Sequence, residues 1–203
     1  MSDSPIEIIL NKIMLNNFGL KNHEYLVDST HYDDPCGKQE YRLYSYLSTF
    51  FQDSVILDIG TLSGRSAIAL SHNESNKVIS YNIRNQIPQN HKIYEKKNIE
   101  FRIGNVLHDL KPELISKAKI VMIDIDHYGH TEEKIIQQLE QSGFSGLIIL
   151  DDIDHPRADM KEAMKKLWKN IKLKKYDVTE FGHGSGTGLI LMNTKINIKL
   201  LED

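Results

Sequence analysis

The feature that most constrains this chain is a regular alternation of short apolar runs with amphipathic stretches, which begins near Ser54. The apolar runs have the length of buried β-strands, and the stretches between them carry apolar residues at helical spacing. Strands that alternate with helices are typical of a parallel sheet covered on both faces. We therefore predict an α/β three-layer sandwich with a mostly parallel seven-stranded sheet, an antiparallel final strand and helices on both faces.

The same pattern places the individual elements. Strands are expected at residues 55–57, 77–83, 99–103, 118–123, 146–150, 174–181 and 188–193. Helices are expected at residues 6–18, 40–51, 63–71, 107–116, 131–142 and 157–171, with a polar loop at 22–36 and a loop plus helix at 87–97. We treat 1–203 as a single domain, in which an N-terminal helical segment (1–53) precedes the α/β core (54–203).

Composition excludes several classes of function. The net charge of −3 does not predict a nucleic-acid surface or an anionic membrane partner. Cys36 is the only cysteine, so no intramolecular disulfide forms, which fits a reducing compartment. The N-terminus lacks the basic start and apolar run of a signal peptide, and the apolar stretches are too short to span a bilayer. We expect a soluble cytoplasmic protein.

Polar side chains gather just after the expected strands. These residues are Asp58, Asn82, Asn105, Asp124, Asp126, Asp151 and Asp152. Ligands of parallel α/β sheets bind at the carboxyl ends of the strands, near the point where the strand order reverses. The sequence therefore predicts a ligand site at this edge.

The turn after the first core strand is rich in glycine, with Gly60 and Gly64 between Asp58 and Ser66. Its spacing is neither the dinucleotide fingerprint nor a P-loop. Residues 55–64 resemble the first motif of class I S-adenosylmethionine methyltransferases, which implies a Rossmann-like fold and S-adenosyl-L-methionine as cofactor. By that resemblance, Asp58, Gly60 and Gly64 surround the methionine part of the cofactor, and Thr61 and Ser66 belong to the same site. A tight turn without a ligand is the alternative.

The next two strand ends depart from that family. Its members usually have an acidic residue that holds the ribose hydroxyls, where this chain has Asn82. An amide still forms hydrogen bonds with a hydroxyl, although without charge assistance. Asn105 and Val106 match the family's segment beside the adenine, again with asparagine in place of aspartate. Simple turn formation is the alternative for both asparagines.

The four acids after the fourth and fifth core strands predict metal chemistry. Asp124 and Asp126 are two positions apart and share a face in an extended strand, and Asp151 and Asp152 come from the next strand. Converging carboxylates repel each other unless a cation binds between them. Oxygen ligands favour Mg²⁺ or Mn²⁺ over zinc. The alternative is that these acids cap the following helices.

This acid pattern resembles the metal-dependent O-methyltransferases, most closely the branch that acts on sugars and macrolide glycosides. The resemblance implies Asp124, Asp151 and Asp152 as metal ligands and Asp126 as general base. His127 is the alternative base, because the pKa of histidine lies nearer neutrality. His155 is expected next to the metal ligands, and the Gly-rich residues 182–188 are expected to form a hairpin loop that lines the acceptor pocket.

The resulting expectation is methyl transfer to a sugar hydroxyl, such as that of a deoxyhexose like rhamnose in a glycan. Two alternatives stay open: a catechol- or phenol-type O-methyltransferase, and a non-catalytic cofactor- or sugar-binding module. The expected partner is a small-molecule or glycan substrate, with no nucleic acid and no membrane. The N-terminal helices are expected either to cover the site or to form a homodimer.

Overall fold

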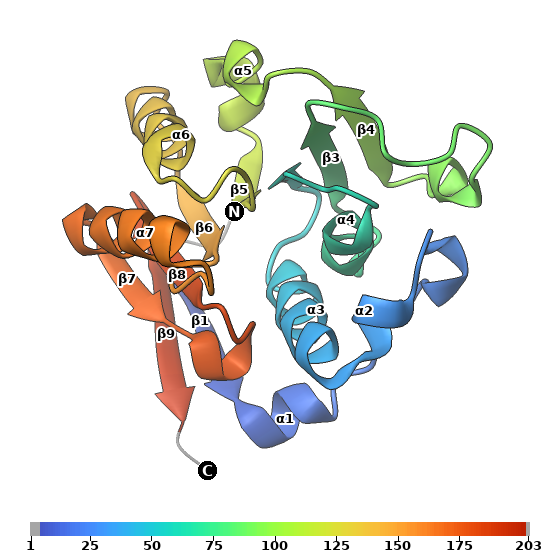
Figure 1. Ribbon diagram of the computed structural model, residues 1–203, viewed down its shortest axis with the longest axis horizontal. Helices are drawn as coiled ribbons and strands as arrows, with labels where there is room; N and C mark the ends of the chain where they lie inside the picture. Colours follow the sequence, from blue (N-terminus) through green and yellow to red (C-terminus); the bar gives the residue numbers. More distant parts are fainter. Residues whose placement is uncertain (1–4, 202–203) are drawn as a thin grey trace.

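A computed structural model describes residues 5–201 as a seven-stranded sheet with helices on both faces (Figure 1). The strands lie in the order β4-β3-β2-β5-β6-β8-β7. Their bounds are β2 (Val55–Ile59), β3 (Lys77–Asn82), β4 (Ile99–Ile103), β5 (Ala118–Ile123), β6 (Gly146–Asp151), β7 (Lys174–Asp177) and β8 (Thr187–Met192). Strands β2 to β6 pair in parallel, whereas β8 runs antiparallel to both β6 and β7. The predicted sheet, including its antiparallel final strand, is confirmed.

Two apolar layers hold the helices against the sheet. Helices α3 (Pro35–Ser48) and α4 (Arg65–Leu70) pack on one face, and α6 (His130–Gln141) and α7 (Ala158–Asn170) pack on the other. Strand β5 serves both layers, because Ile120 and Met122 point to the first and Val121 and Ile123 to the second. A strand buried on both faces reads as a continuous apolar run, which is why the sequence located it.

The prediction of a single helix at the N-terminus is wrong for its first residues, which form a strand. Residues 6–18 do not form one helix: β1 (Ile6–Asn11) comes first and α1 (Lys12–Asn16) follows. The isoleucine-rich run fits strand alternation as well as helical spacing, and its partner β9 (Ile196–Leu201) lies at the other end of the chain. This parallel pair is separate from the main sheet, and the sequence did not predict β9. Asn11 ends the strand and caps α1, since its side chain accepts a 2.9 Å hydrogen bond from the Met14 N–H.

Helix α3 begins earlier than expected. Asp34 and Pro35 mark a helix start here and not a loop, because the Asp34 side chain accepts a 2.7 Å bond from the Gly37 N–H and Pro35 occupies the first turn. The expected loop at 22–36 therefore also contains η1 (His23–Tyr25) and α2 (Thr30–Asp33). The earlier start of α3 places Glu40 inside the helix.

Three further elements are shorter than predicted. Pro112 starts the four-residue α5 (Pro112–Ile115), because proline lacks the N–H that a helix interior needs, and η3 (Val106–His108) precedes it. Strand β7 stops at Asp177, where η4 (Thr179–Phe181) begins. The loop at 87–97 contains only η2 (Lys92–Glu95). Among the helices of residues 5–201, none combines the length and the hydropathy needed to cross a membrane.

Candidate functional site

A cavity of about 650 Å³ lies at the carboxyl ends of the central strands. This volume suits a small-molecule ligand. The predicted site residues that line it are Gly60, Asn82, Asn105, Val106, Asp124, Asp126 and His127. The structure thus brings together residues from the ends of four parallel strands, as the sequence predicted.

The Gly-rich turn packs directly against the end of β5. Gly60 has φ +105°, and a Cβ there would lie 1.6 Å from the backbone oxygen of Asp124. Only glycine fits both the backbone conformation and this close approach. Gly64, with φ +89°, is the N-cap of α4. Together these positions let the turn run tightly between the cavity and the sheet.

Asp58, Thr61 and Ser66 form the buried base of this turn. The Ser80 hydroxyl donates a 2.8 Å hydrogen bond to Asp58 Oδ2. Burial raises the pKa of Asp58, and the hydroxyls of Ser80, Ser66 and Thr61 oppose that rise. These side chains support the turn from the inside, and Asp58 Oδ1 and Thr61 Oγ1 are buried without a hydrogen-bond partner.

The two asparagines behave differently. Asn105 uses its side chain to cap η3, where Oδ1 accepts a 3.1 Å bond from the Leu107 N–H. Asn82, the last residue of β3, has a buried Nδ2 with no hydrogen-bond partner. Buried polar groups rarely lack a partner, so this amide is suited to a ligand oxygen in the cavity. Turn formation therefore accounts for Asn105 but not for Asn82.

Three aspartates meet beside the cavity, at the ends of β5 and β6. Burial raises the pKa of Asp124, and the neighbouring Asp151 and Asp152 raise it further. Burial also raises the pKa of Asp151, whose Oδ1 is buried without a partner. Asp151 and Asp152 have ligand atoms within 4.8 Å of each other and of His183, whereas Asp124 belongs to no such group of three among residues 5–201. An unpartnered carboxylate oxygen beside a second carboxylate fits a bound cation.

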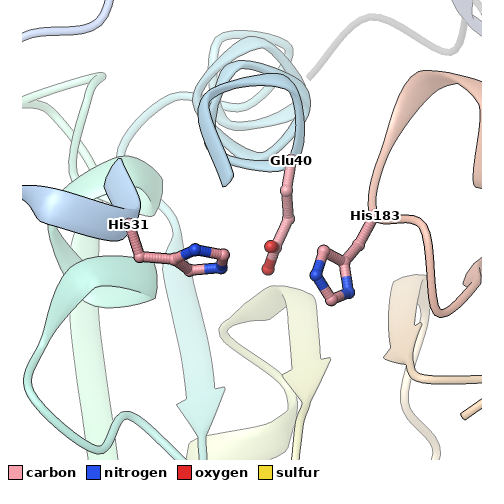
Figure 2. A group of neighbouring side chains, drawn as sticks. All are labelled: His31, Glu40 and His183. Carbon is pink, nitrogen blue, oxygen red and sulfur yellow. The ribbon is translucent and has the colours of Figure 1, made fainter. Parts of the chain in front are cut away.

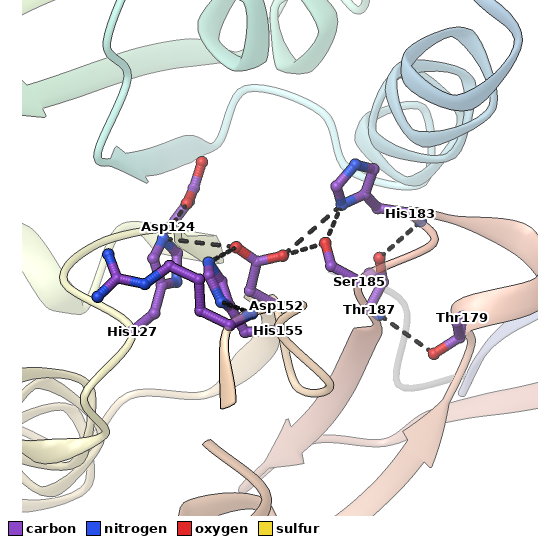
Figure 3. Close-up of polar contacts among 9 residues, drawn as sticks. Asp124, His127, Asp152, His155, Thr179, His183, Ser185 and Thr187 are labelled. Carbon is purple, nitrogen blue, oxygen red and sulfur yellow. Dashed lines mark hydrogen bonds and ion pairs between the residues drawn. The ribbon is translucent and has the colours of Figure 1, made fainter. Parts of the chain in front are cut away.

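The structure adds histidines to this oxygen set (Figure 3). His127 Nε2 lies 3.4 Å from Asp124 Oδ1 and 3.5 Å from Asp152 Oδ2. His155 Nε2 lies 3.6 Å from the same Asp152 oxygen, and its ring stacks on His127 at 5.1 Å. Burial would raise the pKa of Asp152, but His183 and Ser185, together with the other two imidazoles, lower it. Asp152 is therefore the centre of a cluster of imidazoles.

Part of this cluster comes from the Gly-rich segment before β8. The Ser185 hydroxyl donates to Asp152, and His183 Nδ1 lies 3.7 Å from Asp152 Oδ1. The backbone N–H of His183 donates a 3.0 Å hydrogen bond to the Thr187 hydroxyl. The sequence predicted this segment beside the acceptor pocket but gave no signal that its side chains would reach Asp152.

Asp126 does not share a strand face with Asp124, contrary to what the spacing of the two residues implied, and His127 follows it in the same loop. Strand β5 ends at Ile123, and both residues have positive φ values of +31° and +58°, so strand alternation does not apply to them. Asp126 is exposed and accepts a 2.8 Å bond from the Thr131 hydroxyl. His127 turns inward to the acids, and burial lowers its pKa. Both line the cavity, but only His127 contacts Asp124 and Asp152.

The helix-capping alternative for the acids is wrong. The N-cap of α7 is Arg157 and that of α6 is Gly129, and neither position has a side-chain capping bond. Helix capping therefore does not explain the aspartates.

Sequence reasoning missed Glu40, which α3 presents to the acids. It is 5% exposed. Burial, followed by the charge of Asp124, raises its pKa to about 8. The signal was a glutamate four residues before Tyr44, and so on the same helix face as a tyrosine that packs in the core. A charged residue on such a face is rare unless it has a polar partner.

Comparisons with known proteins agree with this fold. No family model and no curated protein matches the chain. Among solved structures, cofactor-bound Rv0187 from MTB has a TM-score of 0.59 and 17% identity, covering 76% of this chain and 79% of that one. A protein from Klebsiella pneumoniae, whose suggested activity is that of an O-methyltransferase, has a TM-score of 0.53 and 17% identity over 90% and 88%.

The SAH-bound methyltransferase PaMTH1 from Podospora anserina is similar as well. Its TM-score is 0.56 and its identity 15%, with 87% of this chain and 91% of that chain covered. Likeness at such low identity concerns the backbone and not the side chains that act on a substrate. The comparisons therefore establish that this chain has the Rossmann-like fold of the methyltransferases.

Proposed function

We propose that the protein is an S-adenosylmethionine-dependent O-methyltransferase that acts on a sugar hydroxyl with the help of a divalent metal. One observation carries the proposal: Asp124 and His127 line the cavity and also belong to the acid–histidine cluster. This cluster consists of the three aspartates Asp124, Asp151 and Asp152 and the three histidines His127, His155 and His183. A cofactor in the cavity and an acceptor at the cluster would therefore meet at the same two residues.

The cavity residues fit the cofactor. Gly60 keeps the backbone close to the methionine part, and the unpartnered Asn82 amide would bind a ribose hydroxyl. Asn105 and Val106 line the same cavity and would lie beside the adenine. When bound, S-adenosylmethionine supplies an electrophilic methyl group for direct displacement.

The acids fit a divalent metal such as Mg²⁺ or Mn²⁺. Asp151 and Asp152 would hold it together with Asp124, because the ligand atoms of Asp151 and Asp152 lie within 4.8 Å of each other and the Asp151 Oδ1 lacks a partner. When bound, the ion lowers the pKa of an acceptor hydroxyl and fixes its direction. The protein's part is to place these carboxylates at the ends of β5 and β6.

His127 is the proposed general base. Burial lowers its pKa and so favours the neutral imidazole that accepts a proton. His127 Nε2 would take the proton of the acceptor hydroxyl, whose oxygen would receive the methyl group as the methyl–sulfur bond breaks and S-adenosylhomocysteine leaves. Asp124 and Asp152, at 3.4 and 3.5 Å, would then stabilise the imidazolium. Asp126 is less well placed because it is already bonded to Thr131.

A sugar acceptor is favoured by the polar character of the cluster. His155, His183 and Ser185 offer several donors and acceptors on the side where the acceptor would bind. Hydroxyl-rich ligands need such groups for their orientation, whereas a phenol needs more apolar surface.

The test is methyl transfer from labelled S-adenosylmethionine to a panel of rhamnosides, other glycosides and catechols, with Mg²⁺, Mn²⁺ or a chelator. We expect transfer to a glycoside that the chelator abolishes, and no transfer by Asp124→Ala. Transfer to catechols alone would overturn the sugar assignment. Transfer that resists the chelator would remove the metal from the mechanism, and cofactor binding without transfer to any acceptor would favour a non-catalytic module.

A further inference from the structure

We propose that His31, Glu40 and His183 form a second metal site, for a borderline transition-metal ion such as Zn²⁺, beside the aspartate cluster. One ligand atom from each residue lies within 4.8 Å of the other two. Figure 2 shows both imidazoles turned toward the Glu40 carboxylate, which stands between them. The three residues come from α2, α3 and the segment before β8, so the fold itself assembles the group.

Each ligand is held in place by its own local structure. A Cβ on Gly37 would lie 1.8 Å from the His31 carbonyl oxygen, so the glycine lets the first turn of α3 pack directly on His31. The backbone of His183 is anchored by the 3.0 Å hydrogen bond from its N–H to the Thr187 hydroxyl. Glu40 is fixed within α3. Because the ligands are already positioned, less conformational entropy is lost when an ion binds.

The orientation of His31 also fits a metal ligand. Its Nδ1 lies 2.7 Å from Asp34 Oδ2, and because a carboxylate only accepts, Nδ1 carries the proton. Nε2 then keeps its lone pair for a metal. A carboxylate behind the second nitrogen is the usual partner of a metal-binding histidine, since it fixes the ring and raises its basicity.

Burial and exposure suit an ion that comes from solvent. The His31 and His183 side chains are 37% and 25% exposed, whereas Glu40 is 5% exposed. Arg65, a cation that acts on Glu40, is bonded to Asp28 instead. The carboxylate therefore lies inside, with two accessible imidazoles in front of it and no committed cation.

The donor types of this site suit a transition-metal ion. Two imidazoles and one carboxylate favour Zn²⁺, Fe²⁺, Co²⁺ or Ni²⁺, while carboxylates alone favour Mg²⁺ and Mn²⁺. His127, Asp152 and His155 offer the same donor types in the neighbouring cluster, so variants of each group are needed to tell the two apart. Three protein ligands leave coordination positions open. The bound ion would join α2 and α3 to the segment before β8, and so stabilise the wall that faces the aspartates.

The test uses the metal-stripped full chain without cofactor, so it does not depend on methyl transfer. Co²⁺ is titrated in excess Mg²⁺ and followed by its visible absorption, and Zn²⁺ is titrated by calorimetry. We expect one tight site in the wild type and at least about tenfold weaker binding in His31→Gln and Glu40→Gln, since each removes one of three ligands. Zn²⁺ should also raise the melting temperature of the wild type but not of these variants.

Two matched controls make the result specific. His155→Gln removes a histidine from the neighbouring cluster around Asp152, and His23→Gln removes an exposed histidine next to α2. Both should bind Co²⁺ like the wild type. Wild-type affinity in His31→Gln and Glu40→Gln would overturn the proposal, as would loss of the tight site in His155→Gln alone. Circular dichroism checks that each variant is folded. If His31→Gln is unfolded, the Co²⁺ affinity of Glu40→Gln alone tests the proposal.

Discussion

At the scale of single residues, Gly60 determines how the turn at the cavity packs. Because it has no side chain, the turn contacts the backbone of Asp124 directly. We expect Gly60→Ala to weaken binding of S-adenosylhomocysteine at least about tenfold, since the added Cβ must push the turn or the end of β5 away. Calorimetry measures the affinity. Gly143→Ala is the matched control: it also has a positive φ, of +75°, but no atom lies within 4 Å of the added Cβ. Equal losses in the two variants would mean that backbone strain, and not the close approach, is responsible.

The choice between the two candidate bases is a second residue-scale prediction. His127→Ala should lower the rate constant of methyl transfer by about 10² to 10⁴, the usual contribution of a general base. Asp126→Asn should have a smaller effect, because Asp126 is exposed and bonded to Thr131. Single-turnover kinetics at saturating cofactor separate this effect from binding. The reverse order of the two losses would return the role to Asp126.

His72 gives a prediction about stability that lies away from the site. Burial lowers its pKa to about 4 from an ordinary value of 6.5, and its ring lies 4.9 Å from that of Phe18. The unfolded chain therefore binds a proton at a higher pH than the folded protein does. Stability from this group is complete above pH 6.5 and is lost as the pH falls toward 4.

Urea unfolding at several pH values measures this dependence. The free energy of unfolding of the wild type should fall more steeply between pH 6.5 and 4 than that of His72→Gln, by at most about 1.4 kcal/mol per pH unit. Parallel curves for the two proteins would show that His72 is protonated equally in both states.

The sequence indicated the candidate site residues that lie at strand ends but not those that tertiary packing brings beside them. Asp124, Asp151 and Asp152 could be found because each directly follows or ends a buried strand. Glu40, His31 and His183 could not, because they reach the same region from elements whose distance in space depends on tertiary packing. The geometry expected for Asp126 was wrong because strand alternation was extended past Ile123, where the strand ends.

At the scale of elements, the strands of the core were predicted well and the N-terminal region was not. Core strands such as β5 and β6 are apolar on both faces and end in polar residues, and that local pattern is sufficient. Strand β1 depends on β9, with Ile6 opposite Ile196, and no local pattern reveals such a pairing. The alternation of buried Ile8 and Leu10 with their more exposed neighbours was compatible with both structures.

The β1–β9 pair should contribute strongly to stability. Ile8 is fully buried, so Ile8→Ala should lower the free energy of unfolding by about 2–5 kcal/mol, through lost burial and a residual cavity. Glu7→Ala is the neighbouring control: it removes only an exposed 2.7 Å ion pair with Lys199, which contributes about 0–1 kcal/mol. Urea denaturation measures both. A loss below about 1 kcal/mol in Ile8→Ala would mean that the pair is not part of the cooperative fold.

At the scale of the whole molecule, the sheet topology places both halves of the proposed reaction at one edge. The parallel strands bring the glycine turn, Asn82 and the aspartates to the same end, while α3 and the segment before β8 lie on the proposed acceptor side. The cavity and the acid–histidine cluster share Asp124 and His127, so two ligands bound there would meet at these residues.

The most direct test of this account is calorimetric titration of the full chain with S-adenosylhomocysteine. The account predicts one site per chain, and an affinity that Gly60→Ala reduces at least about tenfold while Gly143→Ala does not. No binding at millimolar ligand would contradict the assignment of the 650 Å³ cavity to this cofactor, and with it the proposed methyl transfer.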